Sequence, residues 1–178
     1  MKKKKKFSTA NMTKEQVERL SKSNAKKIIN QTDKLRSWGK SGFWKSPRMN
    51  KYFHFRSMLE ANTLKALEKD LYIKEYATEQ FIISYNFKGA MLNYVPDIVL
   101  KTEKGNVFVV EVKPQSQFED EKNVAKWNEA KEWCFSRGAK FIVVCEKDSQ
   151  NICEIVKAYE ANDIPKVHKL MEWKMFHK

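Results

Sequence analysis

The sequence predicts a mixed α/β fold, in which helices pack on both sides of a mixed sheet. A length of 178 residues suggests one domain, or one domain with an extension. The hydrophobic fraction of 42% and the aromatic fraction of 12% are enough for a packed core, which excludes a wholly disordered chain. Segments with helical and strand periodicity follow one another in the order αβββαβ, with no internal repeat, and this order favours an α/β architecture.

The individual elements are predicted from the spacing of apolar residues. Apolar side chains recur at intervals of three and four in the helical segments and alternate in the strands. The Lys104-Gly105-Asn106 turn predicts that the strands on either side of it pair as a hairpin, and Gly138 marks the end of a helix. The expected elements are a helix over about 54–70, strands at 79–85, 94–100 and 107–113, a helix over 122–137, a strand at 140–145 and a helix over 152–159.

The net charge of +13 is concentrated at one end of the chain. Residues 1–50 hold 15 Lys and Arg against 3 Asp and Glu, whereas residues 51–178 hold 20 against 19. Such an imbalance favours a polyanionic partner, because Lys and Arg that approach phosphates release condensed counterions. We therefore divide the chain into a basic N-terminal arm, 1–50, and a nearly neutral domain, 51–178.

The arm is expected to contain three parts. The lysine run at 2–6 should be disordered because like charges repel, a helix should begin at Thr13, and residues 37–48 form a glycine-broken loop that interleaves aromatic and cationic side chains. A solubilising tail whose aromatics pack on the main domain would have the same composition. If the arm binds nucleic acid, the expected contact residues are Lys26, Lys27, Arg36, Trp38, Lys40, Trp44, Lys45 and Arg48.

Composition also excludes several other classes of protein. No stretch approaches the length of apolar sequence that a membrane helix needs, so no membrane partner is expected. The three cysteines are irregularly spaced and lack zinc-ligand partners, which predicts reduced thiols. Reduced thiols fit a cytoplasmic protein, or the host cytoplasm if a phage encodes the chain.

Two apolar strands are interrupted by charged residues. Glu111 and Lys113 are two apart and so face the same side of one strand, and Asp97 can lie beside them through hairpin pairing. Two carboxylates with an ammonium group suit Mg²⁺-assisted phosphodiester hydrolysis, because carboxylate oxygens are ligands for Mg²⁺ and the metal acidifies water. The alternative is a Glu111–Lys113 surface pair on an edge strand, with Asp97 as a turn residue after Pro96.

These residues resemble the motif of the PD-(D/E)xK nuclease superfamily, with Pro96-Asp97 followed by Glu111-Val112-Lys113. Residues 55–60 are similar to the first-helix segment of phage endonuclease I, a junction-resolving enzyme. Residues 79–85, and 130–138 leading into 141–144, are similar to the TnsA N-terminal nuclease domain. The resemblance covers about residues 54–146. It implies a restriction-endonuclease-like fold, with a mixed central sheet flanked by helices and a basic helical N-terminal extension.

The resemblance also implies roles for individual residues. Asp97, Glu111 and the backbone carbonyl of Val112 would be metal ligands, and Lys113 would be the catalytic lysine. Glu60 would bind a second metal ion or hold a metal-bound water. The alternative for Glu60 is a helical ion pair with Arg56, four residues away. The expected metal is Mg²⁺, with Mn²⁺ able to substitute.

The function that follows is a Mg²⁺-dependent DNA endonuclease, acting on branched DNA such as a Holliday junction or on phage or mobile-element DNA. The alternative is a non-catalytic nucleic-acid-binding protein on the same fold, with a packaging or RNA-associated role, since a lysine tail does not distinguish RNA from DNA. Phage endonuclease I forms a strand-swapped dimer, so a homodimer is one expected assembly and a partner subunit is another.

Overall fold

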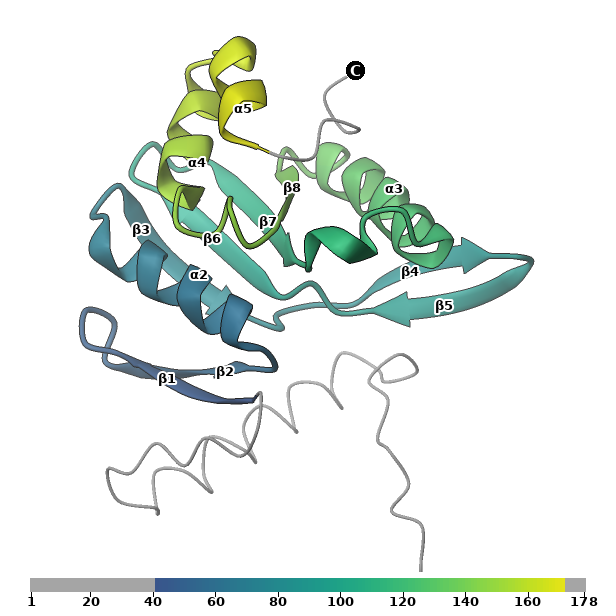
Figure 1. Cartoon of the computed structure of the whole chain (residues 1–178), viewed down its shortest axis with the longest axis horizontal. Helices are drawn as coiled ribbons and strands as arrows, with labels where there is room; N and C mark the ends of the chain where they lie inside the picture. Colours follow the sequence, from purple (N-terminus) through teal and green to yellow (C-terminus); the bar gives the residue numbers. More distant parts are fainter. Residues whose placement is uncertain (1–40, 172–178) are drawn as a thin grey trace, which may run out of the picture.

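The computed structural model describes residues 41–171, and a four-stranded mixed sheet lies at its centre (Figure 1). The strands lie in the order β3-β6-β7-β8. The pairs β3–β6 and β6–β7 are antiparallel, and β7–β8 is parallel, as expected when a helix connects two neighbouring strands. The strand bounds are β3 Ile73–Thr78, β6 Ile98–Thr102, β7 Val107–Val112 and β8 Lys140–Val144.

Helices cover both faces of this sheet. Successive residues of a strand point to opposite faces, and along β7 Val110 therefore packs in one core cluster and Val109 in the other. On the first face lie α2 (Met58–Lys69), α4 (Ile152–Glu160) and α5 (Ile164–Leu170). On the second face lies α3 (Glu121–Phe135), which follows a short 3₁₀ helix, η2 (Gln115–Gln117). No helix within residues 41–171 is long and apolar enough to span a membrane.

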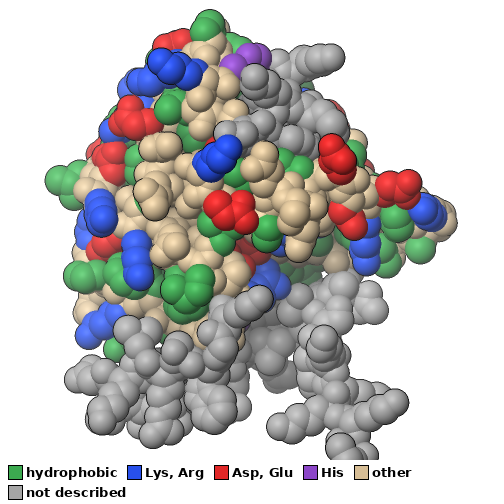
Figure 2. All heavy atoms as spheres, viewed as in Figure 1, with side chains coloured by type: hydrophobic (Ala, Val, Ile, Leu, Met, Phe, Trp, Pro, Cys, Tyr) green, Lys and Arg blue, Asp and Glu red, His purple; other side chains and the backbone are tan. Residues whose placement is uncertain are grey.

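Two antiparallel hairpins complete the fold. β4 (Ile83–Phe87) pairs with β5 (Ala90–Tyr94), and this hairpin packs against α3 and projects beyond the central sheet (Figure 1). β1 (Gly42–Ser46) pairs with β2 (Lys51–Phe55), beside α2. Figure 2 shows cationic and anionic side chains intermixed on the face that it displays, in keeping with the near neutrality of the sequence after residue 50.

The predicted fold class is confirmed. A core in the order αβββαβ is present as α2, β3, β6, β7, α3 and β8, but its first strand is β3 rather than the predicted segment 79–85, which contributes to the β4–β5 hairpin inserted between β3 and β6. The hairpin predicted across Lys104-Gly105-Asn106 is present as β6–β7, with Gly105 at a φ of 85°. The second helix, the last strand and the helix after it also match closely.

Other predicted boundaries are wrong. The helix expected from residue 54 begins at Met58, because the preceding residues form β2. The strand expected at 79–85 lies at 83–87, and the one expected at 94–100 spans the end of β5 and the beginning of β6. β3 was not predicted.

The loop expected at 37–48 is also wrong for its described part. Gly42–Ser46 is a strand, and Trp44 donates a hydrogen bond to the Tyr76 hydroxyl at 3.3 Å and packs against the core on the α2 side. The boundary placed after residue 50 therefore divides a hairpin, and β1 belongs with the folded unit. The lysine run and the helix expected from Thr13 lie outside the described residues.

Candidate active site

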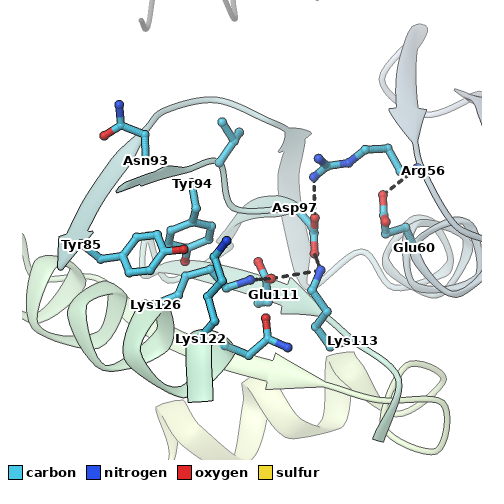
Figure 3. Close-up of a pocket in the computed structure, with 12 residues that line it drawn as sticks. Arg56, Glu60, Tyr85, Asn93, Tyr94, Asp97, Glu111, Lys113, Lys122 and Lys126 are labelled. Carbon is cyan, nitrogen blue, oxygen red and sulfur yellow. Dashed lines mark hydrogen bonds and ion pairs between the residues drawn. The ribbon is translucent and has the colours of Figure 1, made fainter. Parts of the chain in front are cut away.

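Asp97 lies immediately before β6, at the end of the segment that follows the β4–β5 hairpin. Its side chain is buried, and both of its carboxylate oxygens accept hydrogen bonds, of which Figure 3 shows the one from Arg56. Arg56 Nη2 donates to Oδ1 at 2.8 Å, and the backbone N–H of Val112 donates to Oδ2 at 2.9 Å. The second bond fixes Asp97 to the end of the neighbouring strand, because Val112 is the last residue of β7.

Glu111 and Lys113 project from the end of β7 beside Asp97. Lys113 Nζ lies 3.1 Å from Glu111 Oε1 and 3.8 Å from Asp97 Oδ2. Glu111 is only 1% exposed, and β7 lies between β6 and β8. The alternative of a surface ion pair on an edge strand is therefore wrong, and the three motif residues do converge.

Lys126 is a member of this cluster that the sequence analysis missed. It lies on α3, is mostly buried, and places Nζ 2.6 Å from Glu111 Oε1. The same ammonium group lies 5.0 Å from the centre of the Tyr94 ring. Glu111 thus has two lysine partners, one from its own strand and one from the helix that covers it.

Glu60 faces the same region from the first turn of α2. Its carboxylate accepts hydrogen bonds from the Ser57 hydroxyl at 3.0 Å and from the Arg56 backbone N–H at 2.8 Å, while Ser57 caps the helix by accepting from the Glu60 N–H. The arrangement is similar to a capping box, except that the Glu60 carboxylate accepts from the N–H of the residue before the N-cap. The alternative of an Arg56–Glu60 side-chain ion pair is wrong, because the guanidinium contacts Asp97 and Glu79 instead.

A cavity of about 360 Å³ connects these groups. Its lining combines acidic, basic and aromatic side chains that come from α2, the β4–β5 hairpin, β7 and α3, as Figure 3 shows. The lining includes Arg56, Glu60, Tyr85, Tyr94, Lys113 and Lys122. An open pocket beside buried carboxylates is a place where a charged substrate can reach them.

Burial and neighbouring charges shift the pKa values of the site in opposite directions. Burial, followed by repulsion from Glu111, raises the pKa of Asp97 to about 7. Burial would also raise the pKa of Glu111, but attraction by Lys126 and Lys113 outweighs it and lowers this pKa. The pKa of Lys113 is raised, because the two carboxylates outweigh the effect of its burial. Glu111 therefore stays ionised to a lower pH than Asp97 does.

The donor set suits a hard cation such as Mg²⁺. Glu111 Oε2 and the Tyr94 hydroxyl are buried and have no hydrogen-bond partner within residues 41–171, so oxygen atoms that need a partner lie beside the cavity. Within the same residues, no group of three Asp, Glu, His or Cys side chains is already close enough together to hold a metal ion. Each Asp97 oxygen already accepts one hydrogen bond, so a metal ion bound by Asp97 would compete with the Arg56 guanidinium or the Val112 N–H.

Three of the predicted nucleic-acid contacts lie within the described residues. Arg48 donates hydrogen bonds to the backbone carbonyls of Leu67 and Ile73, so its guanidinium stabilises the folded domain. Trp44 is packed as described above, whereas Lys45 is exposed. The remaining predicted contacts, Lys26, Lys27, Arg36, Trp38 and Lys40, lie outside the described residues.

The part of the chain that contains the motif matches a known family. Residues 70–146 match the family model described as TnsA-like endonuclease N terminal. The match confirms the resemblance to TnsA and is consistent with a PD-(D/E)xK nuclease. It includes Asp97, Glu111, Lys113 and Lys126, whereas Glu60 precedes it. No curated protein matches the chain. The resemblance of residues 55–60 to phage endonuclease I stays a prediction.

Proposed function

We propose that this protein is a metal-dependent endonuclease that hydrolyses phosphodiester bonds in DNA. The observation that supports this most is the convergence of Asp97, Glu111 and Lys113 at one cavity, within the segment that matches TnsA-like endonucleases. Buried carboxylates are costly to maintain without partners, and a cluster of this kind is typical of a metal-assisted hydrolase.

In this proposal Asp97 and Glu111 hold Mg²⁺, or Mn²⁺ in its place, with the Val112 carbonyl as a further ligand. The metal supplies an acidified water and neutralises charge on the phosphate. Lys113 lies within 4 Å of both carboxylates, so its ammonium group can orient the attacking water and stabilise the developing anion. Glu60 lines the same cavity and would hold a second metal ion or a water.

We further propose that the substrate is branched DNA, or phage or mobile-element DNA, and that residues 1–50 bind its backbone. The support is the charge of that segment, with 15 Lys and Arg against 3 Asp and Glu, together with the similarity of residues 55–60 to a junction-resolving enzyme. A homodimer or a partner subunit would supply the second cut. The three cysteines are unpaired thiols, which supports a cytoplasmic location.

The direct test is DNA cleavage with purified protein. Supercoiled, linear and four-way-junction DNA are incubated with Mg²⁺, with Mn²⁺ or with a chelator, and we expect cleavage only with metal. Glu111→Gln should abolish it, whereas Glu129→Gln, on the exposed face of the same α3 that carries Lys126, should cut like the parent. If no DNA is cut, or if Glu111→Gln cuts as fast as the parent, the proposal is wrong.

The alternative of a non-catalytic binding protein makes a different prediction in the same assay. It predicts salt-dependent binding to DNA or RNA with every substrate left intact, and no effect of Glu111→Gln on binding. A competition between the two polymers then separates a DNA-binding from an RNA-associated role.

A further inference from the structure

Arg56 is the first of the two residues between β2 and α2, and its side chain reaches into the site from there. β2 ends at Phe55, and Ser57 is the N-cap of α2, so the backbone on both sides of Arg56 is fixed. Its own N–H is held by the Glu60 carboxylate at 2.8 Å. The guanidinium extends to Asp97, as Figure 3 shows.

The guanidinium blocks the carboxylate oxygen that a metal would need. Arg56 Nη2 lies 2.8 Å from Asp97 Oδ1, and Oδ2 already accepts from the Val112 N–H. The Val112 N–H belongs to the backbone of β7 and cannot turn away from Oδ2 on its own, whereas the Arg56 side chain can turn away from Oδ1. Oδ1 is therefore the atom that a metal ion would bind, and Arg56 is the group that has to leave.

Arg56 has both a second anchor and room to move. Its Nε lies 3.3 Å from Glu79 Oε1, so it keeps one anionic partner after leaving Asp97. Its side chain is 39% exposed, in contrast to 2% for Asp97, and it lines the cavity. A guanidinium group pairs with phosphate oxygens at least as well as with a carboxylate, through two parallel N–H bonds.

We propose that Arg56 is a positioning residue that couples metal binding to nucleic-acid binding. Without nucleic acid it neutralises Asp97 and competes with the metal. When a DNA phosphate enters the cavity, the guanidinium transfers to the phosphate and Asp97 Oδ1 becomes available to the metal. The inference rests on the proposed function, and because linkage is reciprocal, the metal must tighten DNA binding by the same factor as DNA tightens metal binding.

The test measures metal affinity rather than cleavage. Ca²⁺ is titrated calorimetrically into the full chain with and without a short DNA duplex, and a gel confirms that the duplex stays intact. The variants are Arg56→Gln and a matched control, Lys122→Gln. Lys122 lines the same cavity but has no ion pair with a carboxylate in residues 41–171. Both variants remove one positive charge from the cavity.

In the parent we expect DNA to tighten Ca²⁺ binding by about tenfold, within the usual range of coupling between sites. Arg56→Gln should bind Ca²⁺ about as tightly without DNA as the parent does with it, and DNA should add little. Lys122→Gln should keep the gain on DNA addition. Should Arg56→Gln fail to fold, Arg56→Lys, which keeps the charge but cannot bridge two carboxylates, should show a coupling intermediate between zero and that of the parent.

Three outcomes would overturn the inference. If Arg56→Gln and Lys122→Gln change Ca²⁺ affinity equally and both keep the DNA effect, the contribution of Arg56 is its charge alone and no transfer occurs. If the parent binds Ca²⁺ equally well with and without DNA, the two sites are not coupled. The proposed function is tested separately, by the metal-dependent cleavage of DNA. A chain that binds no metal under any condition contradicts both the coupling and the proposed function.

Discussion

The contact between Lys126 and Glu111 gives the strongest prediction about the stability of the site. Lys126 Nζ lies 2.6 Å from Glu111 Oε1, and the two side chains are 11% and 1% exposed. Removing one partner of a buried ion pair costs about 3–5 kcal/mol, because the other charge is left without compensation. Glu111 keeps Lys113 at 3.1 Å, so we expect Lys126→Met to lower the free energy of unfolding by about 2–3 kcal/mol.

The stability that Lys126→Met loses should depend on pH. Burial opposes the ionised form of Glu111, but Lys126 and Lys113 outweigh it, so the pKa in the folded protein lies below the ordinary value of 4.5. A depressed pKa stabilises the folded state above the unfolded pKa, and that stabilisation is lost as the pH falls through the folded pKa. The difference between the parent and Lys126→Met should therefore be full at pH 7 and shrink below about pH 4.

Urea unfolding, followed by circular dichroism at several pH values, measures this difference. Lys122→Met is the control, because Lys122 lies on the same helix but is exposed, and it should change stability by less than about 0.5 kcal/mol. The reasoning is refuted if Lys126→Met is as stable as the control variant at pH 7, or if its deficit is the same at pH 7 and in acid.

Two further predictions concern residues outside the site. Arg48→Ala should lower the free energy of unfolding in urea by about 2–4 kcal/mol, because it removes two charged donors from the carbonyls of Leu67 in α2 and Ile73 in β3. Lys45→Ala should leave stability nearly unchanged, and equal effects of the two variants would contradict the structural role of Arg48. Burial raises the pKa of Cys134 and of Cys153 to about 12, so a thiol reagent should label neither residue at pH 8 until urea unfolds the protein. Rapid labelling of the native protein, detected by absorbance, would show that these thiols are accessible.

The elements that the sequence predicted well are those whose packing follows a simple period. β7 is buried on both faces and reads as a run of apolar residues, and the α3 helix has its inward residues at helical spacing. The turn between β6 and β7 is short and contains Gly105 at positive φ, so the pairing of these strands is determined locally. Because Asp97 and Glu111 lie at the ends of these paired strands, their convergence was predictable too.

The missed elements have patterns that imitate something else. β3 has a register shift between Ile73 and Glu75, and its buried residues Ile73 and Tyr76 are three apart, which is helical rather than strand spacing. Phe55 and Leu59 are four apart and suggest one continuous helix, but Phe55 ends β2. The end of β2 was thus assigned to the helix that follows it, and the β1–β2 hairpin was not predicted.

Lys126 was missed because lysines are normally exposed, and a sequence does not say which one points inward. One signal was present. Lys126 lies four residues before Ala130 and eight before Cys134, and all three lie on the buried face of α3. A cation on the apolar stripe of a helix needs a buried anion, and Glu111 is the carboxylate on the strand that this helix covers.

The β1–β2 hairpin also determines where the chain can be cut for experiments on the basic arm. A truncation that removes residues 1–50 deletes β1 and leaves β2 without its hydrogen-bonding partner. β2 leads directly into Arg56 and the first turn of α2, so weaker DNA binding by that protein would not distinguish loss of the arm's charge from loss of order at the site. A truncation that removes residues 1–40 keeps the hairpin intact. The salt dependence of DNA binding by that shorter protein therefore reports on the arm alone.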